Sequence, residues 1–453
     1  MNLFYNPSFK QFLYTALFLA VVSIIIAKGI KIGILFAAGI LGLGLYLILK
    51  TQNKGGIAHI FAGYIIGGEV FFRMAGGVPF DYSKYSTILL LGLALLVDKR
   101  QRQLSLGIIL YMLLLLPAIY LSFFYFPMGF ALKANVILNI LGPITLFVST
   151  LYFFRFKMTM QEFVNLSRWI VLGVFATSII VLLKVGDYSA IQFTHSSNGA
   201  ASGGFSGNQV SIAFGIGVMM IGMNMVMKNR LFYYLLIDLG LLFLFIFQGL
   251  MTFSRGGMAS AILAVFAGAF LYYFSNLQQL IEFFRKYLIY LILGIAFSLS
   301  AFIVVDDMTG GFLYQRYFNV DKSGKQSKKD LTTGRGDIVK GDLMLFEDSS
   351  YVGVGVGVSK YVRPLHRGYA PHVEYSRMLA DHGILGAMAL IIMFFLPLQQ
   401  FFLILGKSEL QMIFGTFMVV ALLTMTHAAM RLGMVGFFYG LAFIILTKRQ
   451  NNA

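Results

Sequence analysis

The sequence contains no cysteine, which excludes a disulfide framework and any metal site built on thiolates. The histidines do not supply a metal site either, because they are scattered without metal-ligand spacing. They are His59, His195, His366, His372, His382 and His427. We therefore expect a chemistry that needs neither a metal ion nor another cofactor.

Charged residues are also scarce. They make up 12% of the chain and hydrophobic residues 58%, whereas a soluble domain has roughly 25% charged residues. A soluble fold of 453 residues cannot hide that much apolar surface, so the composition predicts an integral membrane protein. The formal net charge is +17, but most Lys and Arg stand in short loops between apolar runs. This placement favours a membrane-topology signal over a nucleic-acid surface.

Long apolar runs are what the sequence has in abundance. A bilayer-crossing helix needs about 20 apolar residues, and a window of about 19 residues locates the candidate spans. They are Phe12–Ala27, Ile32–Leu49, Ile57–Phe72, Ser86–Val97, Leu106–Phe124, Ala134–Phe154, Ile170–Leu183, Gln209–Met227, Leu231–Gln248, Met258–Phe274, Tyr287–Val305, Ile384–Leu405, Met412–Thr426 and Gly433–Thr447. We predict an all-α polytopic transmembrane bundle of about 12–14 spans.

The positions of Lys and Arg predict the orientation of these spans, since cytoplasmic loops are enriched in them. With a cytoplasmic N-terminus, the inner loops hold Lys50, Lys54, Lys99, Arg100, Arg102, Arg155, Lys157, Arg168, Lys228, Arg230, Arg285, Lys286, Lys407, Lys448 and Arg449. The one long hydrophilic stretch, Asp306 to Tyr375, then lies outside. We divide the chain into a transmembrane region (1–305), an extracytoplasmic loop (306–375) and C-terminal transmembrane helices (376–453).

Charges that persist beside hydrocarbon on one side of a membrane are candidate functional residues. The first candidate is Arg255, which follows Ser254, precedes Gly256 and stands between two spans on the outer side. The second is Gly334-Arg335, inside the outer loop. The alternatives are an interfacial snorkelling arginine at the first position and a solvated loop arginine paired with Asp337 at the second.

The third candidate is His372, which stands with Glu374 at the start of a helix leading through Gly383 and Gly386 into the next span. A histidine is a plausible general base because its ordinary pKa is near 6.5, and Glu374 is the second choice. A lone histidine at a helix start is more often structural.

Arg73 and the glycine-rich segment around Gly355 each allow two interpretations. Arg73 either reaches an anionic ligand or forms an intrahelical ion pair with Glu69, four residues earlier. The Gly-Val alternation around Gly355 either offers backbone N–H groups to a phosphate or makes a close backbone turn, which is the commoner use of such glycines.

The order of these segments resembles the O-antigen ligase and polymerase superfamily of bacterial membrane glycosyltransferases. In that family a Ser-Arg-Gly stretch opens a helix, a Gly-Arg element begins a large periplasmic loop, and a glycine-rich stretch precedes a late histidine with a following Gly-x-x-Gly. A Gly-Asn segment heading a span, here Gly207-Asn208, also matches. The resemblance runs from about Gly203 to Leu390.

The resemblance implies a GT-C-like fold in the bacterial cytoplasmic (inner) membrane, with the active site facing the periplasm. It implies a metal-independent, inverting transfer of a glycan from an undecaprenyl-diphosphate carrier to an acceptor hydroxyl, in polysaccharide or lipopolysaccharide biosynthesis. The acceptor is lipid A core, a polysaccharide or a protein. Arg255, Arg335 and Arg73 would bind the diphosphate, and His372 or Glu374 would take the acceptor's proton. Ligases of this family often have Asn, Ser or Gln after the histidine, where this chain has Val373, so ligase and polymerase both stay open.

Other classes fit the span pattern less well. A flippase for lipid-linked oligosaccharides would also have many spans, but transporters of that kind usually show two similar halves, and none are visible here. We also considered a peptidoglycan polymerase of the shape, elongation, division and sporulation family. The signature residues of that family are not found in this sequence. A protein O-oligosaccharyltransferase of the same fold stays open.

Overall fold

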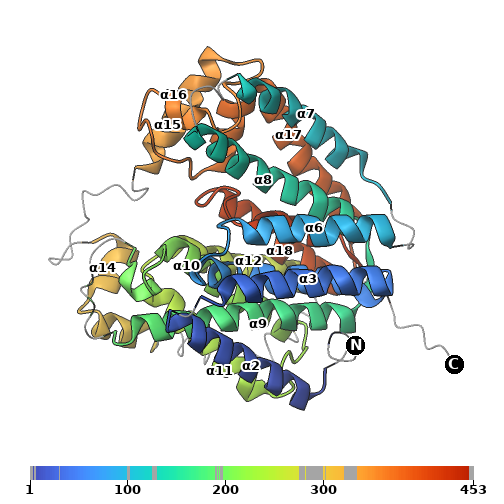
Figure 1. Ribbon diagram of the computed structural model, residues 1–453, viewed down its shortest axis with the longest axis vertical. Helices are drawn as coiled ribbons and strands as arrows, with labels where there is room; N and C mark the ends of the chain where they lie inside the picture. Colours follow the sequence, from blue (N-terminus) through green and yellow to red (C-terminus); the bar gives the residue numbers. More distant parts are fainter. Residues whose placement is uncertain are drawn as a thin grey trace.

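The computed structural model describes residues 4, 7–29, 31–98, 103–124, 130–188, 191, 193, 197–274, 281, 299–300, 302–320 and 334–447. Nine helices in these residues are long and apolar enough to cross a membrane. They are α2 (Phe9–Ala27), α3 (Gly33–Thr51), α7 (Leu106–Phe123), α8 (Phe130–Phe153), α9 (Met160–Val185), α10 (Gly207–Val226), α12 (Arg255–Phe274), α17 (Glu374–Leu403) and α18 (Ser408–Met425). The predicted all-α polytopic bundle is confirmed, and Figure 1 shows its long helices running beside one another.

Two predicted spans are wrong as continuous helices. Residues Ile57–Phe72 form α4 (Ile57–Gly67) and the short α5 (Glu69–Met74), and Gly433–Thr447 forms α19 (Gly433–Leu441) followed by strand β2 (Ile445–Thr447). Two more apolar helices, α6 (Tyr82–Val97) and α11 (Leu235–Met251), are shorter than the others. The predicted span Tyr287–Val305 lies largely outside the described residues. The described part of the chain therefore contains fewer full-length spans than the predicted 12–14.

The break after α4 follows from backbone contact with α9. A Cβ atom added at Gly67 would lie 2.0 Å from the carbonyl oxygen of Ile170, and one added at Gly173 would lie 2.4 Å from the nitrogen of Gly68. Only glycine allows so close an approach. An apolar run read for hydropathy alone does not reveal such a contact.

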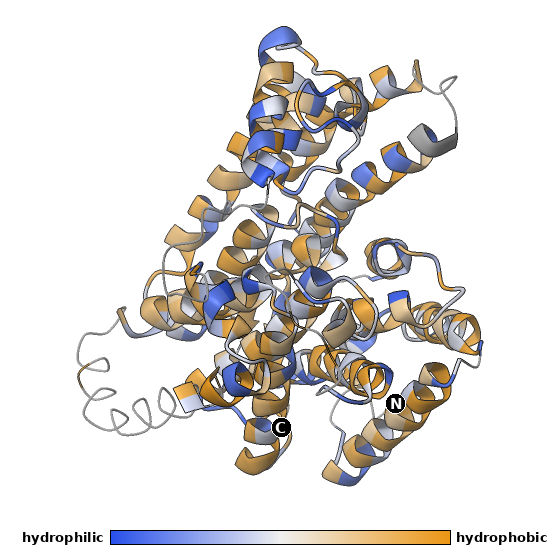
Figure 2. Cartoon of the chain, turned by 90° about the vertical axis from the view of Figure 1, so that its left-hand side faces the viewer, coloured by the Kyte–Doolittle hydropathy of each residue, from blue (hydrophilic) through white to orange (hydrophobic). Residues whose placement is uncertain are grey.

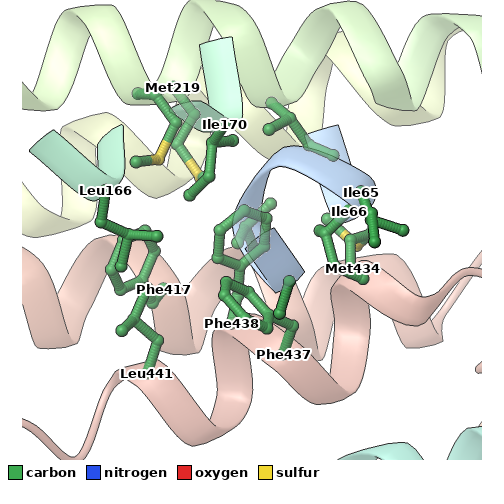
Figure 3. Close-up of a cluster of buried hydrophobic side chains, with 14 of the residues drawn as sticks. Ile65, Ile66, Leu166, Ile170, Met219, Phe417, Met434, Phe437, Phe438 and Leu441 are labelled. Atoms are coloured by element: carbon green, nitrogen blue, oxygen red, sulfur yellow. The ribbon is translucent and has the colours of Figure 1, made fainter. Parts of the chain in front are cut away.

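Helices α4 and α19 are the centre of the bundle, because every residue of both is buried. A helix that is hydrophobic all round is typical of such a position. Figure 3 shows Ile65 and Ile66 of α4 with Phe437 and Phe438 of α19 in this core, and Phe417 of α18 stacks on Phe438 with ring centroids 5.1 Å apart. Inside a membrane such contacts stabilise by van der Waals packing, since lipid is as apolar as the side chains.

One end of the bundle gathers exposed basic residues, and we call it the basic end. There β1 (Lys157–Thr159) pairs in parallel with β2. Asn53, after α3, donates hydrogen bonds to Asp98 after α6 (2.9 Å) and to Tyr152 in α8 (3.0 Å). The exposed cations of the neighbouring loops are Lys50, Lys54, Lys157, Lys228, Arg230 and Lys407.

The opposite end holds the starts of α10, α12 and α17 and the turn of residues 426–432 between α18 and α19, and we call it the site end. The short α14 (Phe312–Phe318), α15 (Arg335–Asp348) and α16 (Ser359–Val362) complete it. Hydrophilic residues gather around α15 and α16 in the upper part of Figure 2, whereas the long helices are mainly hydrophobic. The predicted domain boundaries at 305 and 375 stay a prediction.

Helix α17 is kinked where it enters the bundle. Gly383 has φ 62° and ψ −142°, a conformation outside the helical region. A Cβ atom added at Gly386 would lie 2.1 Å from the carbonyl oxygen of Met378. The Gly-x-x-Gly pattern therefore has a mechanical role, because one glycine bends the helix and the other accommodates the bend.

Candidate active site

Two sequence motifs meet where α10 and α12 begin. Asn208 is the second residue of α10, and Arg255 is the first of α12, as predicted for both. The hydroxyl of Ser254 donates to the side-chain oxygen of Asn208 at 3.2 Å, and the hydroxyl of Ser211 donates to the carbonyl of Ser254 at 2.8 Å. These bonds fix the turn that carries Arg255.

The glycines after Arg255 let other groups come close. A Cβ atom at Gly257 would lie 2.4 Å from the nitrogen of Ile212, so α10 and α12 touch there. A Cβ atom at Gly256 would lie 2.6 Å from Cδ2 of His427. The Ser-Arg-Gly motif thus makes room for a histidine from the turn between α18 and α19.

Arg335 is the first residue of α15, after Gly334, whose φ of 81° is one that glycine adopts readily. Asp337 lies 3.2 Å from Nε2 of His366. The alternative of an Arg335–Asp337 ion pair is therefore not what the structure shows.

Arg255, Arg316 and Arg335 form a cluster, which we call the arginine cluster. Burial, with the positive charge of Arg255 as the next cause, lowers the pKa of both Arg316 and Arg335 from the ordinary arginine value. Within the described residues, neither Arg316 nor Arg335 makes an ion pair with a carboxylate. Half-buried cations held together in this way attract an anion.

His372 lies two residues before α17, next to this cluster. Burial, together with the charges of Arg431 and Arg335 and the nearby His427, lowers its pKa to about 4. Its imidazole is therefore neutral at pH 7, and its Nδ1 is buried without a hydrogen-bond partner among the described residues. A neutral ring nitrogen with no partner is able to accept a proton.

The turn between α18 and α19 contributes two side chains that the sequence analysis missed. His427 is 7% exposed, its Nδ1 lies 3.0 Å from the carbonyl of Leu423, and its Nε2 has no partner in the described part of the chain. Burial lowers its pKa to about 4. Arg431 donates a hydrogen bond to the carbonyl of Pro371 at 2.7 Å. The only signal was a histidine and an arginine in a short outer loop, which snorkelling explains equally well.

Glu69 and Arg73 support this turn. They form the intrahelical ion pair named above as an alternative, at 2.6 Å. Glu69 also accepts the N–H of Gly433 at 2.9 Å, and Arg73 donates to the carbonyl of Arg431 at 3.0 Å and to Gln209 at 2.6 Å. With its donors engaged in this way, the geometry favours a supporting role for Arg73.

Glu374, the second candidate base, is buried in an ion pair. Both its oxygens accept from Arg377, one of them at 3.0 Å, and one also accepts the N–H of Met430 at 3.2 Å. Arg377 donates in addition to Asp381 at 3.1 Å. These three side chains stand at i, i+3 and i+7 on α17, a spacing that places them on one face of the helix.

The glycine-rich segment makes a close turn against α17. Glycines 353, 355 and 357 have φ values of 73°, 97° and 72°. The N–H groups of Gly355 and Gly357 donate to the carbonyl and the carboxylate of Asp381, each at 3.0 Å. A Cβ atom at Gly353 would lie 2.4 Å from the backbone of Asp381, beside the kink. The N–H groups donate within the protein, so the geometry favours the close turn over the phosphate site.

An ion pair ties this region to α15. Arg363 lies 2.7 Å from Asp342, which also accepts the hydroxyl of Ser376 at 2.8 Å. Burial raises the pKa of Asp342, against the opposing charge of Arg363. Removing one partner of such a buried pair typically costs about 3–5 kcal/mol, so the pair holds α15, and with it Arg335, in place.

A polar cavity of about 240 Å³ lies beside Arg431 and Pro371. It is bounded by α6, α8, α10, α16, α17 and the turn between α18 and α19. A larger cavity of about 450 Å³, between α2, α3, α4 and α9, has no charged lining residue. Chemistry on a charged substrate belongs near the smaller cavity.

The comparison with protein families agrees with the motif order. Residues 239–391 match the family model described as O-antigen ligase, a segment that contains Arg255, Arg335 and His372. A comparison with curated proteins gives no match. The predicted resemblance is thereby confirmed over this segment. Residues 239–391 are thus similar to the O-antigen ligase family, and this similarity supports membrane glycosyltransferase activity in a broad sense.

Proposed function

We propose that this protein transfers a glycan from an undecaprenyl-diphosphate carrier to an acceptor hydroxyl on the periplasmic face of the bacterial inner membrane. It acts as an O-antigen ligase or a repeat-unit polymerase, with lipid A core, a polysaccharide or a protein as acceptor. The observation that carries the proposal is the arginine cluster beside a neutral His372, inside the segment that matches the O-antigen ligase family.

The residues suit the chemistry of this reaction. The acceptor oxygen attacks the anomeric carbon, the bond from that carbon to the diphosphate oxygen breaks, and the acceptor's proton passes to His372. The diphosphate leaves with its negative charge, which Arg255 and Arg335 stabilise, since guanidinium groups bind phosphate oxygens in bidentate fashion. A single in-line displacement inverts the anomeric centre.

His372 is a better base than Glu374. The oxygens of Glu374 are engaged by Arg377 and by a backbone N–H, whereas Nδ1 of His372 has no partner among the described residues. In the free protein the neighbouring arginines contribute to the low pKa of His372. A bound diphosphate compensates their charge and raises that pKa towards neutrality, where a general base works best. Donor binding thereby activates the base.

The arginines take the part that a divalent cation plays in other phosphate-transferring enzymes. The described residues contain no group of three or more His, Asp or Glu side chains arranged to hold a metal ion. We expect transfer to survive EDTA, and loss of transfer that a divalent ion restores would count against the arginine clamp.

Transfer by purified, detergent-solubilised protein from a purified undecaprenyl-diphosphate-linked glycan tests the proposal. We expect His372→Gln to bind the donor normally while turnover falls on the order of a hundredfold or more. His366→Ala is the matched control, because His366 is exposed and its Nε2 pairs with Asp337. Normal turnover in His372→Gln would remove this residue from the mechanism.

A further inference from the structure

We propose that the polar cavity of about 240 Å³ beside Arg431 binds one sugar ring of the acceptor glycan. This inference rests on the proposed function and adds the place of the acceptor to it. The volume equals that of about eight water molecules in the liquid, which suits a single ring.

The lining has the chemistry of a sugar site. Asn135 and Asn139 bring side-chain amides from α8, and Lys360 brings an ammonium group from the start of α16. Asn139 donates to the carbonyl of Asn135 at 2.7 Å, and nothing in the described part of the chain donates to its side-chain oxygen. Polar side chains on a membrane-crossing helix are costly and usually functional. Amides and cations facing one small cavity match the hydroxyl groups of a sugar.

The carboxylates of the lining are already paired. Asp81 lies 2.9 Å from Lys84, and Glu374 is held by Arg377 at 3.0 Å. Lys360 has no ion pair among the described residues. The side-chain oxygen of Asn139 and the ammonium group of Lys360 are therefore available to a ligand.

The position of the cavity points to the acceptor and not to the donor. Arg431 lines the cavity and is bonded to the carbonyl of Pro371, the residue before His372. Burial lowers the pKa of His372, and the charges of Arg431 and Arg335 also lower it. No residue of the arginine cluster lines the cavity. His372 therefore follows a residue of the cavity lining, Pro371, and lies within electrostatic reach of Arg335 in the arginine cluster. An in-line displacement needs the attacking hydroxyl and the leaving diphosphate on opposite sides of the anomeric carbon, so we assign the acceptor to the cavity and the diphosphate to the arginine cluster.

Two variants and two matched controls test this assignment in full-length protein in nanodiscs. The variants are Asn139→Leu and Lys360→Met. The controls are Asn224→Leu, an asparagine of α10 with the same type of hydrogen bond to the carbonyl four residues before it, and Lys340→Met, an exposed lysine of α15. Neither control residue lines the cavity.

The binding probe is the water-soluble glycan released by mild acid from the host's envelope, which carries neither lipid nor diphosphate. Saturation-transfer NMR measures its binding without turnover. In the transfer assay we expect both variants to raise the acceptor KM on the order of tenfold, the effect of one lost hydrogen bond to a charged or buried polar group. The donor KM stays unchanged.

The outcomes separate this inference from the proposed function. Weaker glycan binding in both variants, with normal binding in the controls, supports the assignment of the cavity to the acceptor. Absence of transfer by the wild type would contradict only the proposed function and not this assignment. Unchanged binding in both variants overturns the cavity assignment, as does an equal loss in the controls. A rise in donor KM equal to the rise in acceptor KM overturns the assignment to the acceptor.

Discussion

At the basic end of the bundle the charged side chains are mostly exposed, whereas the site end contains a set of charged side chains that are buried and bonded to one another. Lys157 in β1 and Lys228 in the turn after α10 are both exposed. Glu69, Arg377 and Asp381 at the site end have almost no exposed surface. Exposed cations cost little and set the orientation in the membrane. Buried ions are costly, so a chain that keeps many of them at one end uses them for more than orientation.

The site end also contains charges of two kinds. Glu374 and Arg377 neutralise each other, and Glu69 does the same with Arg73. Arg335 and Arg316 lie together without a carboxylate among the described residues. The difference separates paired ions, which support the fold, from the arginines that we propose bind the diphosphate.

The largest effect is expected from the arginine cluster. Arg255→Lys and Arg335→Lys keep the charge but lose the planar fork, so we expect turnover to fall by roughly a hundredfold to a thousandfold, as for loss of one transition-state donor. Lys228→Gln at the basic end is the control. Full transfer by both Lys variants at normal protein levels would contradict the diphosphate clamp.

The next effect concerns stability. Arg377→Met leaves two buried carboxylates without their partner, and we expect the free energy of unfolding to fall by about 3–5 kcal/mol. Thermal unfolding in detergent measures it. The triple variant Glu374→Gln, Arg377→Met, Asp381→Asn removes the charges together and should recover part of the loss. A single variant as stable as the wild type would show that these ions are not the framework.

The pH dependence should distinguish the free protein from the donor complex. Transfer needs neutral His372, so activity falls as pH drops through its pKa, about 4 in the free protein. We expect kcat/KM for the donor to stay level between about pH 5 and pH 8, and the acid limb of kcat to lie at higher pH. A kcat/KM that already falls near pH 6.5 would mean that His372 is not held neutral. His372→Gln should lose the acid limb.

The smallest effect on activity is expected at the basic end. Lys157→Gln and Lys228→Gln should change transfer by about twofold or less, since exposed substitutions shift energies within about 0.5 kcal/mol. Reporter fusions after Lys228 and after Lys407 should report the cytoplasm, and a fusion near Tyr351 the outside. A cytoplasmic signal at Tyr351 would place the site end on the cytoplasmic face of the membrane. This result would contradict the proposed glycan transfer on the periplasmic face.

The sequence predicted most helices, and the motif residues at which some of them begin, because hydropathy and capping are properties of neighbouring residues. Arg255 and Asn208 stand at helix starts for that reason. The reasoning failed where distant segments meet. The break after Gly67 depends on contact with Ile170, and His427 belongs to the site because Gly256, far away in the chain, leaves room for its ring. Neither signal is visible in a window of neighbouring residues.

The bond from the N–H of Gly433 to Glu69 joins residues 364 positions apart. At a synthesis rate of roughly 5–20 residues per second, the ribosome needs roughly 20–70 seconds to bridge that interval. During this time Glu69 and Arg73 are already in the nascent protein, but the turn that carries His427 and Arg431 has not been made. The site end is therefore completed only after α18 and the turn that follows it have been made. Translation products that stop before His427 lack both His427 and Arg431, and so lack a complete site end.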